Sequence, residues 1–410
     1  MRPRFVQIHT LSSYPAALLN RDDVGFAKRI PFGGATRTRI SSQCLKRHWR
    51  DFEGENSLFS LDVPQSIRSR ITFDQFILKP LIDSGTPEPV ASAAVAALRA
   101  EVLGESAKAK KAKKAKEENG AGPSDDAAKA EGQQTGQVTV LGRPEVDYLL
   151  SVAQRICGQV TEPKKVGEMV KAILDKEGKK NLQSLRLASG LDAALFGRMV
   201  TSDILSRGDA ALHVAHAFTV HEEQAEADYF SAVDDLLKSG DDKQLGSGHI
   251  GSVELTSGLY YGYVVADLPL LVSNVQGCER KNWEQADPTL ASRVIEKLIH
   301  LVATVSPGAK LGSTAPYSYA HMVLVEAGNS QPRTLANAFL TPVDLRPDVL
   351  RNTYHALTGF LKDLDTTYGW DGERAFAAMG PKDILETIPG LARMTVPALS
   401  SWAGQKARGA

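Results

Sequence analysis

The first fifty residues show two strand-like patterns separated by a loop and followed by a helix. Residues 4–10 alternate between polar and apolar side chains, and residues 36–40 alternate β-branched residues with arginine, as half-buried strands do. Between them, residues 20–34 contain a Pro-Phe-Gly-Gly turn signal and are predicted to form a long loop. A helix is predicted over residues 41–52, because its opening serine pair offers an N-cap.

The middle of the chain changes character at residue 84. Residues 84–137 begin with an alanine-rich helical pattern and continue with a lysine run, Lys108–Lys116, and a polar stretch. Such low hydrophobicity with dense charge cannot offset the entropy of ordering, so a flexible insertion is predicted. For the lysine run, a solvated helix or linker is favoured over an RNA contact. Residues 143–200 again have helical periodicity.

The second half of the chain is strand-like at first. Apolar and polar side chains alternate in residues 212–221, and strand-like sequence returns at 249–255 and 259–265 after a charged segment. Two strands that flank a charged excursion predict an arm projecting from a sheet. An amphipathic helix is predicted over residues 290–304, then a strand at 321–326 and helices to the C-terminus. This mixture predicts an α+β fold.

The composition is that of a soluble globular protein, with 42% hydrophobic and 23% charged residues among 410. No stretch is apolar enough for a membrane helix, and the N-terminus lacks the apolar core of a secretory signal. A cytoplasmic protein without membrane contact is therefore expected. The three cysteines form no Cys-x-x-Cys pair, so neither a disulfide framework nor a zinc site is expected.

The net charge of zero hides a split along the chain. Lys and Arg together number 48, as do Asp and Glu, which at first argues against a nucleic-acid partner. Residues 1–50, however, hold ten basic residues against only Asp22 and Asp23, a local charge of +8. Residues 51–410 therefore carry −8, and the basic segment is the candidate for binding phosphates.

The predicted helix over residues 41–52 has an apolar face and a basic face. Leu45 and Trp49 lie on the apolar side, while the polar positions i, i+3, i+4 and i+7 carry one amide and three cations. No carboxylate occurs before Asp51, and the helix N-terminus adds backbone N–H groups and serine hydroxyls that suit an anion. Phosphate binding is therefore favoured over an ordinary solvated face. The candidate residues, including two arginines of the preceding strand, are Arg37, Arg39, Ser41, Ser42, Gln43, Lys46, Arg47 and Arg50.

Other motifs match known chemistry only in part. Residues 246–251 fit Gly-x-Gly-x-x-Gly without the strand and helix of a dinucleotide site, so the base of a flexible arm is favoured. The histidines between 213 and 249 lack a completing cysteine or carboxylate, so packed or surface roles are favoured over metal binding. His9 or His48 would be the general base of an RNA-cleaving enzyme, an alternative that no fixed spacing supports. The aromatic pair at 229–230 is either an anchor or a platform for stacking bases.

Nine short motifs follow one another along the chain and cover most of residues 5–340. They are LNRDD (19–23), FGG (32–34), RISSQ-x-LKR (39–47), GRM-x-TS (197–202), AHAFTVH (215–221), DYFSAVDDL (228–236), GSGHIGSVELTSGLYYGY (246–263), PGAK (307–310) and LANAF (335–339). In this order they resemble the Cas-seven family, in its CasC-type form: the backbone subunit of the type I-E CRISPR Cascade complex. Residues 341–410 match less distinctly.

The resemblance implies an α+β fold with an RRM-like (ferredoxin-like) palm, an inserted helical fingers domain and a β-hairpin thumb. The palm would comprise residues 1–54, 191–217 and 253–410, the fingers 55–190, and the thumb 218–252. The fingers would contain the flexible Lys/Ala-rich insertion.

The resemblance also implies a non-catalytic subunit without metal or cofactor. Copies of it would stack head-to-tail along a CRISPR RNA, beside other Cascade subunits, and leave bases free to pair with target DNA. Each thumb would fold over the RNA and displace a nucleotide at regular intervals. Besides the helix and strand residues named above, the implied RNA contacts are Asn20, Arg21, Lys28, Met199, Tyr229, Phe230 and Lys310.

Overall fold

The chain divides into two compact units. The computed structural model describes residues 2–103, 138–174, 176–183, 185, 187–198, 208–233, 247–309 and 311–409. Unit 1 comprises Met1–Leu61, Leu212–Leu268 and Pro288–Ala410, and unit 2 comprises Asp62–Ala211 and Pro269–Asp287. Unit 2 therefore extends beyond residue 190, where the predicted fingers end.

Unit 1 is built on one large sheet flanked by helices. Its strands are β1 (Phe5–Ala17), β2 (Arg29–Phe32), β3 (Ala35–Ile40), β6 (Leu212–Val214), β7 (Ala217–Thr219), β8 (Gln224–Val233), β9 (Ser247–Asp267), β10 (Met322–Gly328), β11 (Glu373–Ala378) and β12 (Leu391–Arg393). Its helices are α1 (Ser42–Asp51), η1 (Phe59–Leu61), α10 (Thr289–Thr304), η5 (Ala336–Phe339), α11 (Val349–Tyr368), η6 (Lys382–Thr387) and α12 (Val396–Arg408). The predicted α+β class is confirmed.

The strand order within this sheet is β12-β11-β10-β1-β9-β7-β3-β2, and β6 and β8 also pair with β9. β1 lies antiparallel between β10 and β9, and β9 is antiparallel to β6 and β7. The chain visits these central strands in the order β1, α1, β6–β7, β9, α10, β10. That is the connectivity of a βαββαβ unit.

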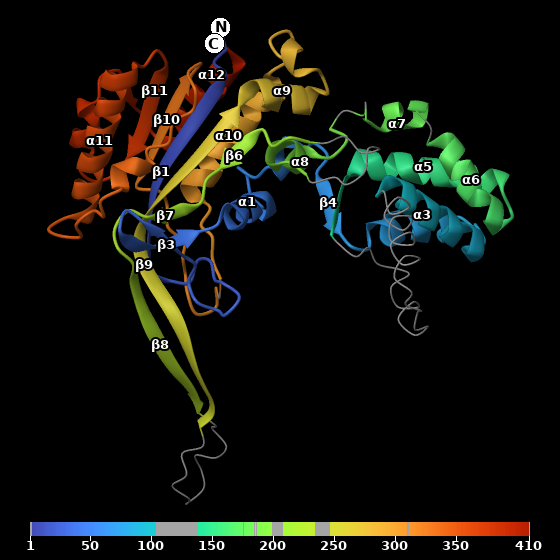
Figure 1. Cartoon of the computed structure of the whole chain (residues 1–410), viewed down its shortest axis with the longest axis horizontal. Helices are drawn as coiled ribbons and strands as arrows, with labels where there is room; N and C mark the ends of the chain where they lie inside the picture. The colour runs from blue at the N-terminus through green and yellow to red at the C-terminus, as the bar shows by residue number, and fades with distance from the viewer. Residues whose placement is uncertain are drawn as a thin grey trace, which may run out of the picture. The chain divides into compact units, whose positions relative to one another are not determined.

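Helices cover both faces of the sheet (Figure 1). On one face, Leu357 and Leu361 of α11 pack with Leu11 and Tyr261 of the central strands. On the other face, α10 packs against α12 and the sheet. Because both faces are buried there, residues 6–9 of β1 form a continuous buried run rather than a clean alternation.

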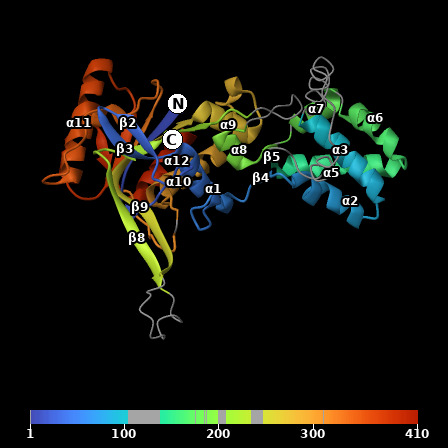
Figure 2. The ribbon, with the colours of Figure 1, turned by 60° about the horizontal axis from the view of Figure 1, so that its bottom comes forward.

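The β8–β9 hairpin projects from the sheet in both views (Figures 1 and 2). β9 is one strand of 21 residues, so the two predicted strands at 249–255 and 259–265 are parts of a single strand. The charged segment 224–233 is itself a strand, paired from Gln224↔Ser257 to Val233↔Ser247. Residues 224–230 of this strand are exposed, and although residues 224–229 alternate polar with apolar side chains, their acidic residues made the segment look like a charged excursion.

Unit 2 is mainly helical. Its elements are β4 (Ser66–Ser69), η2 (Asp74–Leu78), α2 (Lys79–Asp83), α3 (Glu88–Val102), β5 (Thr139–Gly142), α5 (Arg143–Gln159), α6 (Pro163–Ile173), α7 (Lys176–Gln183), α8 (Leu191–Phe196), α9 (Leu268–Gln276) and η4 (Arg280–Asn282). Leu98 of α3 and Leu149 of α5 are buried in its core. The flexible insertion was predicted to start at residue 84, which is too early, because α3 packs into this core. Residues 104–137 lie outside the described residues.

Within the described part of the chain, no helix combines the length and apolarity that a bilayer crossing requires.

Candidate nucleic-acid interface

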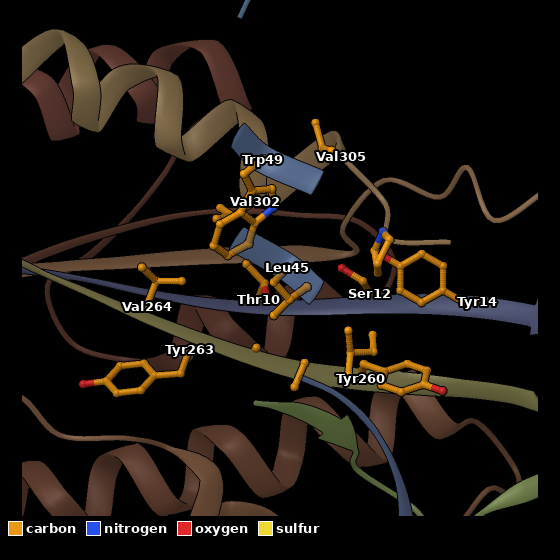
Figure 3. A pocket seen from close by; sticks show the side chains of 14 residues that line it. Thr10, Ser12, Tyr14, Leu45, Trp49, Tyr260, Tyr263, Val264, Val302 and Val305 are labelled. Atoms are coloured by element: carbon orange, nitrogen blue, oxygen red, sulfur yellow. The ribbon is translucent and has the colours of Figure 1, made fainter. Parts of the chain in front are cut away.

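Helix α1 presents a polar face because its apolar face is anchored to the sheet. Trp49 is buried and, with Leu45, lines a cavity of about 40 Å³ above β9 (Figure 3). Val305, just after α10, lines the same cavity. Gln43 and Arg47 on the opposite side are exposed. The helix predicted over residues 41–52 and its two faces are confirmed.

Both serines at the start of α1 form hydrogen bonds within the protein. Ser41 is the N-cap: its hydroxyl accepts a hydrogen bond from the Cys44 N–H at 3.3 Å, and its own N–H donates to the Asn20 side-chain oxygen at 2.9 Å. The Ser42 hydroxyl donates to Gln43 Oε1 at 3.4 Å. Both serines are more than 90% buried. Their predicted hydroxyl contacts with a phosphate therefore compete with these bonds.

The loop before β2 is held by its own polar groups. The Asp22 carboxylate accepts hydrogen bonds from the backbone N–H groups of residues 24–26 at 2.8–3.0 Å. The Lys28 N–H donates to the Asn20 carbonyl at 2.9 Å and closes the loop. Asn20 thus links the loop to the α1 N-cap, while Arg21 is exposed. The loop presents Arg21 and Lys28 from a fixed backbone.

Three predicted RNA-binding cations gather around His216, in the bend between β6 and β7. Arg39 Nη1 lies 2.9 Å from His216 Nδ1. The pKa of His216 is lowered by partial burial and by the positive charges of Arg39, Lys28 and Lys46. The imidazole is therefore neutral at pH 7 and accepts the Arg39 hydrogen bond. No local motif marks His216 as a member of this site, since the pairing of β3 with β7 brings it there.

The basic face of α1 ends at a carboxylate. Arg47 Nε lies 3.4 Å from Asp51 Oδ2, and Arg50 Nη2 lies 2.8 Å from Asp51 Oδ1. Arg47 and Asp51 are exposed and Arg50 is partly exposed, and ion pairs near the surface contribute only about 0–1 kcal/mol. A phosphate can therefore replace Asp51 at little cost, but Arg47 and Arg50 are partly neutralised without one.

Arg37 is a correction to the predicted set. Its side chain is fully buried, and its guanidinium donates to the carbonyl oxygens of Phe32 (3.3 Å), Thr219 (3.1 Å) and Phe339 (3.0 Å). Burial lowers the pKa of Arg37. The arginine thus joins the β2–β3 turn, β7 and η5, and it offers no surface to a phosphate in this structure.

The aromatic pair lies on the exposed hairpin. Tyr229 is 64% exposed and Phe230 is 41% exposed. Phe230 pairs with Gly251 on β9, and a Cβ on that glycine would lie 2.4 Å from the Phe230 ring. This glycine of the Gly-x-Gly-x-x-Gly match makes room for an aromatic ring across the hairpin. Two other predicted contacts, Met199 and Lys310, lie outside the described residues.

The two histidines considered for RNA cleavage, His9 and His48, contact other groups of the protein through their ring nitrogens. His9 is fully buried, with Nδ1 2.9 Å from the Tyr261 hydroxyl and Nε2 3.4 Å from Glu326 Oε2. His48 Nδ1 lies 2.8 Å from a carbonyl within α1, and its Nε2 accepts the Gly308 N–H at 3.3 Å.

The histidine-rich segment provides no metal site within the described residues, where no group of His, Cys, Asp or Glu side chains could hold an ion. His221 Nε2 instead accepts the Leu259 N–H at 3.1 Å, and its Nδ1 donates to the Glu222 carbonyl at 2.6 Å. Burial lowers the pKa of His221, which keeps it neutral in this role.

A family model matches almost the whole chain. The family model described as "CT1975-like protein" (Cas_CT1975) matches residues 6–402. No curated protein matches the chain.

Solved structures of CRISPR RNA-guided surveillance complexes share its fold. A chain of "CRISPR RNA-guided surveillance complex, pre-nicking" superposes with a TM-score of 0.73 at 23% identity, covering 98% of this chain and 100% of that one. A chain of "CRISPR RNA-guided surveillance complex" gives 0.64 at 21% identity, covering 98% and 99%. With its family model matched over almost the whole length, the chain belongs to the CT1975-like family, a Cas-seven-like family.

Proposed function

We propose that this chain is a non-catalytic backbone subunit that binds CRISPR RNA in a surveillance complex of the type I-E Cascade class. The observation that carries the proposal is the gathering of Lys28, Arg39 and Lys46 around His216, beside helix α1. These cations come from three separate elements, so the fold brings together charge that the sequence distributes.

The chemistry of this patch suits RNA held without regard to sequence. Lysine and arginine contacts to phosphates fix a strand in place but carry no base information. Exposed aromatics such as Tyr229 and Phe230 add stacking that every base accepts, worth about 1–3 kcal/mol per base. Phosphate contacts on unit 1, together with a hairpin that displaces single nucleotides, would leave the intervening bases free for target DNA.

The proposed partners are copies of the same chain in a head-to-tail filament, other Cascade subunits, and target DNA through the guide. The type I-E assignment rests on the order of the nine motifs. Membership of the CT1975-like family and the shared fold support the general role. A projecting hairpin would provide the kind of heterologous, non-closing contact that a filament requires.

The proposal is tested by charge reversal. The double variant Lys28→Glu/Lys46→Glu should lose co-purifying CRISPR RNA while keeping the circular dichroism and Tm of the wild type. Arg346→Glu/Arg351→Glu, on the exposed surface at and before α11, is the matched control and should retain RNA. RNA retained by the Lys28/Lys46 variant would overturn the proposal. Cleavage of labelled repeat RNA by the purified protein would overturn its non-catalytic part.

A further inference from the structure

Arg29 lies in the basic loop region but differs from its neighbours. Its guanidinium forms ion pairs with Glu223 before β8 and with Glu254 on β9. The Glu254 side chain is only 13% exposed, and its second oxygen accepts the Ala27 N–H at 2.7 Å. One carboxylate of the hairpin therefore holds both the backbone and the side chain of the loop that presents Lys28.

This contact continues into the cation patch. The Arg29 carbonyl accepts a hydrogen bond from Arg39 Nε at 3.1 Å, and the Arg39 N–H donates to the Lys28 carbonyl at 2.8 Å. Arg39 also reaches His216, the centre of the patch. Arg29 thus connects the root of the hairpin to the proposed phosphate site, beside the bond from Ala27 to Glu254.

The hairpin needs such an anchor. Residues 224–230 of β8 are exposed, and a two-stranded hairpin is marginal by itself. Glu254 pairs with Ala227, six positions along β8 from Val233, a span of about 20 Å at 3.4 Å per residue. A rocking of about 10° at the root would therefore move the backbone near Val233 by about 3–4 Å, whereas functional groups must be held to about 0.5 Å.

We propose that Glu254 is a positioning residue, which with Arg29 locks the aromatic hairpin to the basic loop at a fixed distance from the phosphate site. This inference rests on the proposed function, because the quantity it sets is the register between the displaced nucleotide and the held phosphates. Glu254 does not bind RNA: two carboxylates against one arginine leave the root negative, which directs phosphates toward the Lys28 side.

The test compares Glu254→Ala and Glu254→Gln with Glu226→Gln, which removes the same charge from an exposed position of β8. In the RNA-free full chain, exchange of the Ala27 amide should accelerate at least tenfold in Glu254→Ala and stay unchanged in Glu226→Gln. In complexes assembled on guide RNA, hydroxyl-radical footprints should lose contrast at least threefold at the displaced nucleotides in Glu254→Ala, with bound RNA kept within twofold.

Footprints of Glu254→Ala as sharp as those of Glu226→Gln would overturn the inference while leaving the proposed function standing. Wild-type protein that binds no RNA would overturn the proposed function and this inference with it. If Glu254→Ala fails to fold, Glu254→Gln decides: it keeps an oxygen for the Ala27 N–H and loses the ion pair. A weaker loss of contrast would support the positioning role, and unchanged contrast would refute it.

Discussion

Arg37 tests whether the basic segment is a uniform RNA-binding surface or contains a structural cation. The variant Arg37→Met keeps much of the side-chain volume and removes three hydrogen bonds, to Phe32, Thr219 and Phe339. Each bond contributes about 1 kcal/mol net, so we expect a loss of about 3 kcal/mol in the free energy of unfolding. For a domain of the size of unit 1 this lowers the Tm by about 6–12 °C.

The assay pairs thermal unfolding of the RNA-free protein with RNA binding measured well below the Tm. Arg39→Met is the matched control, two positions along the same strand, partly exposed and within the cation patch. It should lower the Tm by less than about 3 °C and weaken RNA binding by roughly fivefold, about 1 kcal/mol. Arg37→Met should do the reverse. An unchanged Tm with lost RNA affinity in Arg37→Met would refute the structural role and restore Arg37 as an RNA contact.

Three further predictions concern the fold. Gly33→Ala should lower the unfolding free energy by more than about 3 kcal/mol, because Gly33 has a φ of +63° and an added Cβ would lie 1.5 Å from the Leu340 carbonyl oxygen. Gly34→Ala, with a φ of +78° and open space around the added Cβ, should lower it by only about 1–2 kcal/mol. Equal losses for the two variants in urea titrations would contradict this prediction. Burial raises the pKa of Glu326, but His9, Arg374 and Arg333 outweigh it and bring the pKa below its usual value. This stabilisation is complete above the unfolded-state pKa of 4.5 and is lost as pH falls through the lower folded pKa, so Glu326→Gln should flatten the pH dependence of unfolding below pH 4.5; an unchanged slope would argue against it. Arg198→Ala should destabilise unit 2 by about 3–5 kcal/mol, because it leaves fully buried Glu145 without its partner at 2.6 Å; a loss under 1 kcal/mol in chemical denaturation would exclude this.

Local sequence patterns predicted the elements that are determined by caps and by the periodicity of apolar residues. Helix α1 was predicted from its serine cap and its two faces, and α10 from its apolar periodicity over residues 290–304. The strand at 373–378 was missed, because a short apolar run next to helices looks the same in a helix and in a buried strand. The strand at 224–233 was missed because its acidic residues make it look like part of a charged excursion, although polar and apolar side chains alternate over residues 224–229.

The candidate site shows the same limit at the level of single residues. Arg37 and Arg39 are two positions apart on one strand, so the sequence pattern places them on one face and assigns them one role. Carbonyl groups of β7 and η5, which come much later in the chain, bind Arg37 in the interior, whereas Arg39 stays partly exposed. His216 joins the site for the same reason, through a strand pairing that no local motif encodes.

Several cations of residues 1–50 bind groups of the protein itself, and this changes the salt dependence expected for RNA affinity. The +8 of residues 1–50, fully engaged with phosphates, would give a slope of log affinity against log salt of about −6, at roughly −0.7 per phosphate on a single strand. The structure assigns Arg37 to carbonyls and Arg29 to carboxylates, and pairs Arg47 and Arg50 with Asp51. If the patch of Lys28, Arg39 and Lys46 holds three phosphates, the slope should be about −2 per subunit, measured with an RNA short enough for one copy. A slope near −6 would show that the paired arginines are released to RNA, and that the cations around His216 are not the centre of the site.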